Sequence, residues 1–125
     1  MRNIGFIGCG NMGGAILNGI LKAGLLAPEH IFIHTATPAK REELAAKLHV
    51  CAVNSNREVV ENADLIILAV KPYLFDEVFA QIKEALSEDK VLISVAAGQS
   101  LANMEKLSNA ETKIIRTMPN TPVSV

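Results

Sequence analysis

A glycine-rich turn near the amino end constrains the fold of this chain more than any other feature. It reads Gly8-Cys9-Gly10-Asn11-Met12-Gly13, follows a short β-rich run at residues 3–7, and precedes an apolar stretch with helical spacing. A GxGxxG pattern is weak evidence alone, but a strand before it and a helix after it are the context of a dinucleotide-binding fingerprint. We expect Gly8 to make a tight turn, Gly10 to let the backbone approach a pyrophosphate, and Gly13 to let the helix pack closely. The first N–H groups of that helix would then face the anion.

Short apolar runs alternate with amphipathic stretches along the rest of the chain. Strands are expected at residues 3–7, 31–33, 51–53, 65–70, 91–95 and 114–115, and helices at residues 15–26, 38–49, 57–62, 74–86 and 100–107. The run at 65–70 is continuously apolar, as in a strand buried on both faces of a parallel sheet. Parallel neighbours need crossover connections, which the helices supply. The pattern predicts an α/β fold: a Rossmann-type doubly wound parallel sheet of about six strands, forming a single domain over residues 1–125.

The composition narrows the class of protein. The chain has 125 residues, 12 basic and 13 acidic side chains and a net charge of −1, so no basic surplus points to nucleic acid or anionic lipid. Its longest apolar runs fall far short of the ~20 residues of a membrane span, and a strand-like amino end does not suit a signal peptide. Cys9 and Cys51 form no CxxC pair, which argues against a disulfide framework or a zinc site. We expect a soluble, cytoplasmic domain without a metal.

The segment after the second expected strand bears on the choice of nicotinamide cofactor. An NAD site usually has Asp or Glu about 20 residues beyond the glycines, where it binds the ribose 2′-hydroxyl. This chain has the sequence HTAT at residues 34–37, with no carboxylate to repel a 2′-phosphate. Thr35 and Thr37 can donate hydroxyl hydrogen bonds, and Lys40 and Arg41 follow, although both also suit an exposed helix face. The sequence therefore predicts NADPH, with NADH bound more weakly.

Three later loops are expected at the carboxyl edge of the sheet, where ligands of open α/β sheets bind. They are Ala69-Val70-Lys71-Pro72, Ala96-Ala97-Gly98 and Met118-Pro119-Asn120-Thr121-Pro122. Lys71 would reach a phosphate or a ribose, and the small residues of the second loop would admit a flat ring. Asn120 and Thr121 would face the nicotinamide. Each loop is also compatible with ordinary turn chemistry.

Three other polar side chains have more than one interpretation. We interpret His34 as a strand-end residue near the adenosine rather than a catalyst. Asn56 would contact the adenine ribose or would cap the short helix after it. Cys9 has the chemistry of a nucleophile, but no histidine lies near it in the sequence. We assign no catalytic side chain to this chain.

Four segments together resemble pyrroline-5-carboxylate reductase. They are IGFIGCGNM at residues 4–12, ADLIILAVKP at 63–72, SVAAG at 94–98 and RTMPNTP at 116–122. The resemblance implies an NADPH-dependent reduction of the C=N bond of 1-pyrroline-5-carboxylate to L-proline, the last step of proline biosynthesis. It also implies cofactor contacts from Ile7, Gly8, Cys9, Gly10, Asn11, Met12, Thr35, Thr37, Asn56, Ala69, Val70, Lys71, Pro72, Ala96, Ala97 and Gly98, with Asn120 and Thr121 close to the substrate.

The family has a second, all-helical domain after the MPNTP segment, and that domain forms the dimer and supplies much of the substrate pocket. It is absent from this chain, so we expect the fragment alone to be inactive, and the full-length protein to be a homo-oligomer. Gly13 stands where many members carry alanine, which should not disturb helix packing. Two alternatives remain: the cofactor domain of a β-hydroxyacid or 6-phosphogluconate-type dehydrogenase, whose GxGxMG pattern also fits, and a stand-alone, non-catalytic NADPH-binding module.

Overall fold

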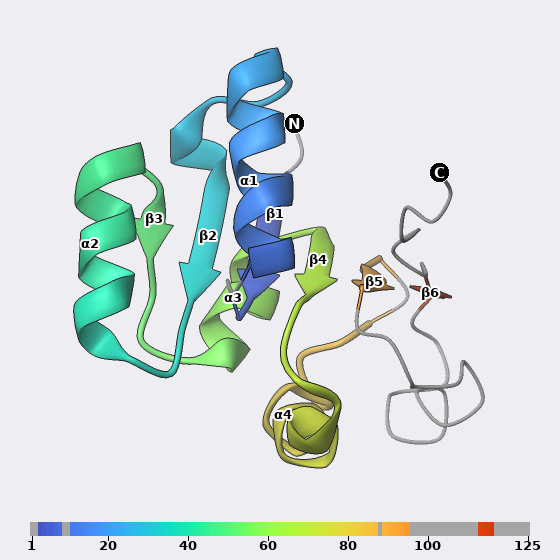
Figure 1. Ribbon diagram of the computed structural model, residues 1–125. Helices are drawn as coiled ribbons and strands as arrows, with labels where there is room; N and C mark the ends of the chain where they lie inside the picture. Colours follow the sequence, from blue (N-terminus) through green and yellow to red (C-terminus); the bar gives the residue numbers. More distant parts are fainter. Residues whose placement is uncertain (1–2, 9–10, 88, 96–112, 117–125) are drawn as a thin grey trace, which may run out of the picture.

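The computed structural model describes residues 3–8, 11–87, 89–95 and 113–116, which form one parallel sheet with helices on both faces (Figure 1). The six strands are β1 (Ile4–Ile7), β2 (Ile31–His34), β3 (Cys51–Ala52), β4 (Leu65–Leu68), β5 (Val91–Ser94) and β6 (Lys113–Arg116). Their order is β3-β2-β1-β4-β5-β6, and every pair is parallel. The strand order reverses between β1 and β4, so the predicted Rossmann-type sheet is confirmed, with its switch point at the end of β1.

The strands are also in register, so their carboxyl ends meet at one edge. Ile7 at the end of β1 lies opposite His34 of β2 and Leu68 of β4. Leu68 in turn lies opposite Ser94, the last residue of β5. Loops that leave these strands therefore emerge side by side, where the sequence predicts a ligand.

Four α-helices in the described residues cover the sheet: α1 (Asn11–Ala23), α2 (Pro38–Leu48), α3 (Asn56–Asn62) and α4 (Phe75–Ile82). On one face, α1 and α2 cover a group of buried side chains that we call the α1–α2 cluster: Phe6, Leu17, Ile31, Ile33, Val50, Ile67 and Val95. On the other face, α3 and α4 cover the α3–α4 cluster: Ile7, Val59, Val60, Ala63, Ile66, Leu68, Phe75, Val78, Phe79, Ile82, Leu86 and Leu92. Neighbouring residues of one strand belong to opposite clusters, as the two-residue repeat of a strand requires.

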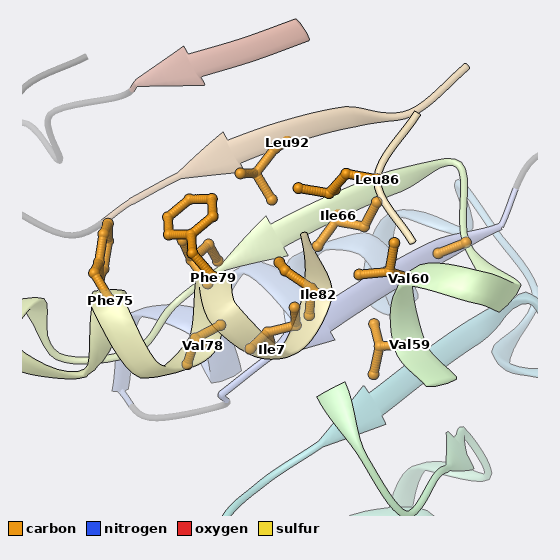
Figure 2. Close-up of a cluster of buried hydrophobic side chains, with 12 residues drawn as sticks. Ile7, Val59, Val60, Ile66, Phe75, Val78, Phe79, Ile82, Leu86 and Leu92 are labelled. Atoms are coloured by element: carbon orange, nitrogen blue, oxygen red, sulfur yellow. The ribbon is translucent and has the colours of Figure 1, made fainter. Parts of the chain in front are cut away.

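The α3–α4 cluster contains more buried side chains than the α1–α2 cluster among the described residues, and two of them are aromatic. Figure 2 shows Phe79 and Ile82 of α4 directed toward the strand residue Ile66. The rings of Phe75 and Phe79 meet edge to face, with centroids 5.9 Å apart. Phe79 is fully buried, and burying a side chain of this size contributes roughly 2 kcal/mol. The cluster thus holds α3 and α4 rigidly against β4 and β5.

The first helix begins and ends earlier than the sequence pattern indicates. It starts at Asn11, directly after the glycine turn, and stops at Ala23. The predicted end at residue 26 is wrong because Gly24 takes a left-handed conformation (φ 68). The Gly24 N–H then bonds to the Leu21 carbonyl (3.1 Å) and the Leu25 N–H to the Ile20 carbonyl (3.2 Å), a Schellman closure.

Other element boundaries also move. The helix predicted over residues 74–86 is shorter, because a 3-10 turn at Pro72–Leu74 precedes α4. The strand predicted over 65–70 ends at Leu68, where the chain turns away from the sheet. Ser55, not Asn56, caps α3: its hydroxyl oxygen accepts from the Glu58 N–H (3.1 Å). The helix predicted at 100–107 lies outside the described residues. In the part of the chain that the structure describes, none of the helices is both long and apolar enough to cross a membrane.

The end of α2 yields a first testable prediction. His49 closes this helix at φ 63, with its N–H bonded to the Ala45 carbonyl (2.8 Å). A side chain in this region is strained, whereas glycine is not, so we expect His49→Gly to raise the free energy of unfolding by about 0.5 kcal/mol. Urea denaturation measures the change. His49→Ala keeps the Cβ and should gain nothing; an equal gain for alanine would show that strain is not the cause.

Candidate functional site

The glycine turn follows β1 and packs against the ends of β2 and β4 at the switch point. Gly8 has φ 80, and its N–H donates to the His34 carbonyl (3.0 Å). A Cβ on Gly8 would lie 2.7 Å from Val70 Cγ1 and 2.9 Å from the Ala69 carbonyl oxygen. Both the conformation and the lack of space therefore require glycine, as the predicted tight turn demands.

Gly13 brings the start of α1 against the loop that follows β4. A Cβ at this position would lie 3.0 Å from the Ala69 Cβ and 3.2 Å from the Gly8 carbonyl oxygen. The predicted close packing of helix and strands is therefore present. Cys9 and Gly10 lie outside the described residues, as do Ala96, Ala97, Gly98, Asn120 and Thr121. Asn11 and Met12 form the first turn of α1.

A cavity of about 450 Å³ opens beside the turn, within the size range of small-molecule sites. It lies between the carboxyl ends of β1, β2 and β4 and the helices α3 and α4. Its lining comprises Gly8, His34, Ala36, Asn54, Ser55, Asn56, Arg57, Val70, Leu74, Glu77, Val78 and Gln81. Val70, Leu74 and Val78 form an apolar wall against which a flat base can pack. Residues 54–57 form a polar wall that can face the polar groups of a ligand.

The polar wall is linked to α4 by an amide pair. The Asn56 Nδ2 donates to the Gln81 Oε1 (2.7 Å). The Asn56 Oδ1 is buried and has no hydrogen-bond partner in the part of the chain that the structure describes. A buried acceptor without a donor is costly, so a ligand hydroxyl or amine that reaches it after a small shift of the side chain would be favoured.

Arg57 lies at the rim of the cavity and is paired with two acidic side chains. Its Nε is 3.2 Å from Glu61 Oε2, and its Nη1 is 3.5 Å from Glu84 Oε1. All three side chains are at least half exposed, so these pairs contribute little to stability. Arg57 therefore adds a guanidinium to the cavity lining, and its charge is partly neutralised by two neighbouring carboxylates.

The end of β2 differs from the arrangement expected from sequence. Thr35 is buried, and its hydroxyl donates to the Thr37 carbonyl (2.9 Å). The Arg41 Nη2 donates to the Thr35 carbonyl (3.2 Å). The cavity lining includes His34 and Ala36 but neither Thr35 nor Thr37. Residues 31, 33 and 35 are buried on the α1–α2 side, so the alternation of the strand directs His34 to the ligand side.

The other predicted cofactor residues are divided between the cavity and its surroundings. Val70 and Asn56 line the cavity, whereas Ile7 is fully buried and offers its carbonyl to the Ala69 N–H (2.9 Å). Lys71 is exposed, and Pro72 begins the 3-10 turn. Lys71 is thus free to reach a phosphate, but it lies outside the lining of this cavity.

Sequence reasoning missed the contribution of α4. Glu77, Val78 and Gln81 of α4 line the cavity, together with Leu74, which directly precedes the helix. The spacing of 74, 78 and 81 places these residues on one helical face, a signal that was available. It went unused because apolar residues at this spacing are equally typical of a core face, which Phe75 and Phe79 do form on the same helix.

The described residues hold no group of three or more histidine, cysteine or acidic side chains able to bind a metal ion. The groups that line the cavity are instead amides, a hydroxyl, a histidine, an arginine, one carboxylate and apolar side chains. This set suits an organic ligand with a flat ring and hydroxyl groups.

A sequence model for a protein family matches residues 3–98, which contain the glycine turn and the whole cavity lining; the family is described as NADP oxidoreductase, coenzyme F420-dependent. The chain belongs to that family. Within this NADP oxidoreductase family, the resemblance to pyrroline-5-carboxylate reductases is also confirmed. The enzyme of that name from Escherichia coli K12 is 41% identical over 124 residues, which cover 99% of this chain and 46% of that relative.

Solved structures agree with the sequence comparison. A pyrroline-5-carboxylate reductase from Coxiella burnetii superposes with a TM-score of 0.88 at 34% identity, over 98% of this chain and 46% of that one. A pyrroline carboxylate reductase from Plasmodium falciparum with NADP bound superposes with a TM-score of 0.83 at 32% identity, over 97% of this chain and 43% of that one. The chain therefore spans about half the length of the relatives that it matches.

Proposed function

We propose that this chain is the NADP(H)-binding half of a pyrroline-5-carboxylate reductase, which reduces 1-pyrroline-5-carboxylate to L-proline in proline biosynthesis. The observation that carries the proposal is the Gly8 turn, which is held between β2 and β4 at the switch point and opens onto the cavity. The relative from Plasmodium falciparum, which binds NADP, supports the choice of cofactor. We also propose a cytoplasmic setting, with which the free Cys51 thiol agrees.

The residues present fit a dinucleotide. The Gly8 turn lies in the cavity lining, and the Asn56 Oδ1 is a buried acceptor in need of a donor. Val70, Leu74 and Val78 would cover an adenine ring and exclude water from it. Gly10 would let the diphosphate approach the first N–H groups of α1. The remaining predicted contacts, from Cys9, Asn11, Met12, Thr37, Lys71, Pro72 and Ala96 to Gly98, would line the path toward the nicotinamide.

The chemistry asks little of side chains in this half. When bound, NADPH supplies the hydride. A protonated cyclic imine is already electrophilic, so the protein must mainly bring the two reactants together in the right orientation. The sheet edge would do this by ending β1, β4 and β5 side by side, in register. We assign no acid, base or nucleophile to the chain.

The substrate pocket is proposed to require more than these residues. Asn120 and Thr121 would border the substrate, and the part of the relatives that has no counterpart here would supply the rest of the pocket. In the proposal this part is helical and mediates a homo-oligomer. It would bind the carboxylate and hold the imine against the nicotinamide.

Cofactor titration tests the binding half of the proposal. We expect NADPH to bind at least about 10-fold more tightly than NADH, because hydrogen bonds to a charged phosphate are worth more than 1 kcal/mol and the HTAT segment has no carboxylate to repel it. Calorimetry or nucleotide fluorescence with both cofactors measures the ratio. Equal or tighter binding of NADH would contradict the argument from the end of β2.

A turnover assay tests the other half. We expect this 125-residue chain to reduce pyrroline-5-carboxylate at no useful rate, since half of the relatives' length is missing from it. Loss of NADPH absorbance in the presence of substrate is the measurement. Substantial turnover would show that the pocket is complete without further residues.

A further inference from the structure

Gln81 of α4 and Asn56 of α3 both line the cavity and are joined by a hydrogen bond. The Asn56 Nδ2 donates to the Gln81 Oε1 over 2.7 Å, which links two side chains 25 residues apart in the sequence. The oxygen and the nitrogen of an amide diverge from one carbon atom, so with Nδ2 on Gln81 the Asn56 Oδ1 points away from it. That oxygen is buried and has no hydrogen-bond partner among the described residues. Gln81 thus decides where an unused acceptor points.

The backbone beside Asn56 is held independently of Gln81. The Ser55 hydroxyl oxygen accepts from the Glu58 N–H (3.1 Å), and the Glu58 Oε1 accepts from the Asn54 N–H (3.2 Å). These bonds close the first turn of α3 in a variant of the capping box. The remaining freedom lies in the Asn56 side chain, whose terminal torsion is broad and roughly two-fold. Its amide therefore needs a partner to select one of the two orientations.

The selected orientation decides what the amide offers a ligand. An amide oxygen only accepts and an amide nitrogen only donates. With Gln81 as the acceptor, the Asn56 oxygen is the group left for a ligand. Gln81 belongs to a helix that the buried Phe79 and Ile82 hold against the sheet, so it is presented from a rigid support (Figure 2). The reverse pair, in which the Gln81 Nε2 donates to the Asn56 Oδ1, would leave a donor for the ligand instead.

We propose that Gln81 is a positioning residue for the cofactor, which holds the Asn56 Oδ1 as the acceptor for an uncharged donor of the adenosine moiety. The inference rests on the proposed function. NADPH has two such donors in this moiety, the 3′-hydroxyl of the ribose and the 6-amino group of the base. Either one would satisfy the buried oxygen. A ligand acceptor at the same place would face that oxygen and be rejected, so the pair also sets specificity.

A double-mutant cycle tests whether Gln81 acts through Asn56. We expect Gln81→Ala to weaken NADPH binding about 5-fold, because the Asn56 amide loses the partner that orients it. In the Asn56→Ala background the same change should alter affinity less than about 2-fold, since nothing remains to be oriented. Calorimetric titration measures the four affinities, and thermal unfolding checks that each protein is folded. An equal loss in both backgrounds would overturn the positioning role.

Lys83→Ala is the matched control for the single change. Lys83 is also exposed and directly follows α4, but it lies outside the cavity lining. We expect this variant to bind NADPH as the wild-type protein does. A 5-fold loss here as well would attribute the effect of Gln81→Ala to a general change in α4, and the proposal would fail.

Two further substitutions separate the two states of the amide pair. A glutamate at position 81 only accepts, so Gln81→Glu should keep the Asn56 Oδ1 available, whereas the lysine of Gln81→Lys only donates and would occupy that oxygen. The probes are two analogues of NADPH, one with hypoxanthine in place of adenine and one without the 3′-hydroxyl. Both have the charge of NADPH, so the ratio of dissociation constants for analogue and parent cancels the effect of the introduced charge.

We expect the wild-type protein and Gln81→Glu to bind one of the analogues about 5-fold more weakly than NADPH, and Gln81→Lys to bind both nearly as well as NADPH. The analogue that loses affinity identifies the donor. If NADPH itself does not bind the wild-type protein, the proposed function fails. If NADPH binds but the wild type tolerates both analogues, or Gln81→Lys discriminates as the wild type does, the role of Gln81 alone is overturned.

Discussion

Replacing Gly10 with valine is expected to remove measurable NADPH binding, a loss of more than about 100-fold, while the protein remains folded. The middle glycine of the fingerprint is where the backbone approaches the diphosphate, so a side chain there occupies the place of the ligand. Fluorescence or calorimetric titration measures the affinity, and circular dichroism with thermal unfolding checks the fold.

Two other glycines provide the controls for this prediction. Gly19 lies in the middle of α1, is exposed, and has open space where a Cβ would be, so Gly19→Val should leave cofactor affinity unchanged. Gly8→Ala should instead lower both affinity and stability, because the new Cβ meets the Ala69 carbonyl at φ 80. Retained affinity in a folded Gly10→Val protein would refute the assigned diphosphate site.

Gly5→Ala is expected to lower the free energy of unfolding by about 2 kcal/mol, the cost of overfilling a packed core. Gly5 is in the middle of β1, and an added Cβ would overlap Val59 Cγ1 and lie 3.0 Å from Ala63 Cβ. Val59 is fully buried and branched at Cβ, so it cannot turn aside easily. Urea denaturation of the single variant measures the loss.

A double variant tests the cause of that loss. Val59→Ala removes the overlapping methyl groups, so Gly5→Ala should cost much less in its presence than in the wild-type background. The two changes together would then destabilise less than the sum of the single changes by about 1 kcal/mol. Strict additivity would show that the contact between β1 and α3 is not the reason for glycine at position 5.

The sequence was sufficient to predict the sheet and two of the three glycine roles. Continuous apolar runs such as Leu65–Leu68 mark buried parallel strands, and the conformations of Gly8 and the packing of Gly13 follow from the fingerprint and its context. These features depend on the local pattern of apolar residues and glycines and on the alternation of strands with helices. Both can be recognised from residues that are close together in the sequence.

The parts that sequence reasoning missed depend on contacts between distant residues. Gly5 reads as an ordinary strand position, and its role appears only when Val59 is packed against it. His34, which is predicted from the sequence to lie near the adenosine, lines the cavity. Thr35 is buried on the same side as Ile33, which only packing in three dimensions reveals, and its contact with the cofactor stays a prediction. The early end of α1 at Ala23 was missed because the apolar pattern continues to residue 26, whereas Gly24 closes the helix first.

The two layers of the core have separate consequences for ligand recognition. The helix that follows the glycine turn rests on the α1–α2 cluster, whereas most of the cavity wall is built on the α3–α4 cluster. A core substitution that loosens one layer should therefore impair recognition of one portion of a dinucleotide and spare the other. Inorganic pyrophosphate and free adenosine, used as probes, would report independently on the two sides of the sheet.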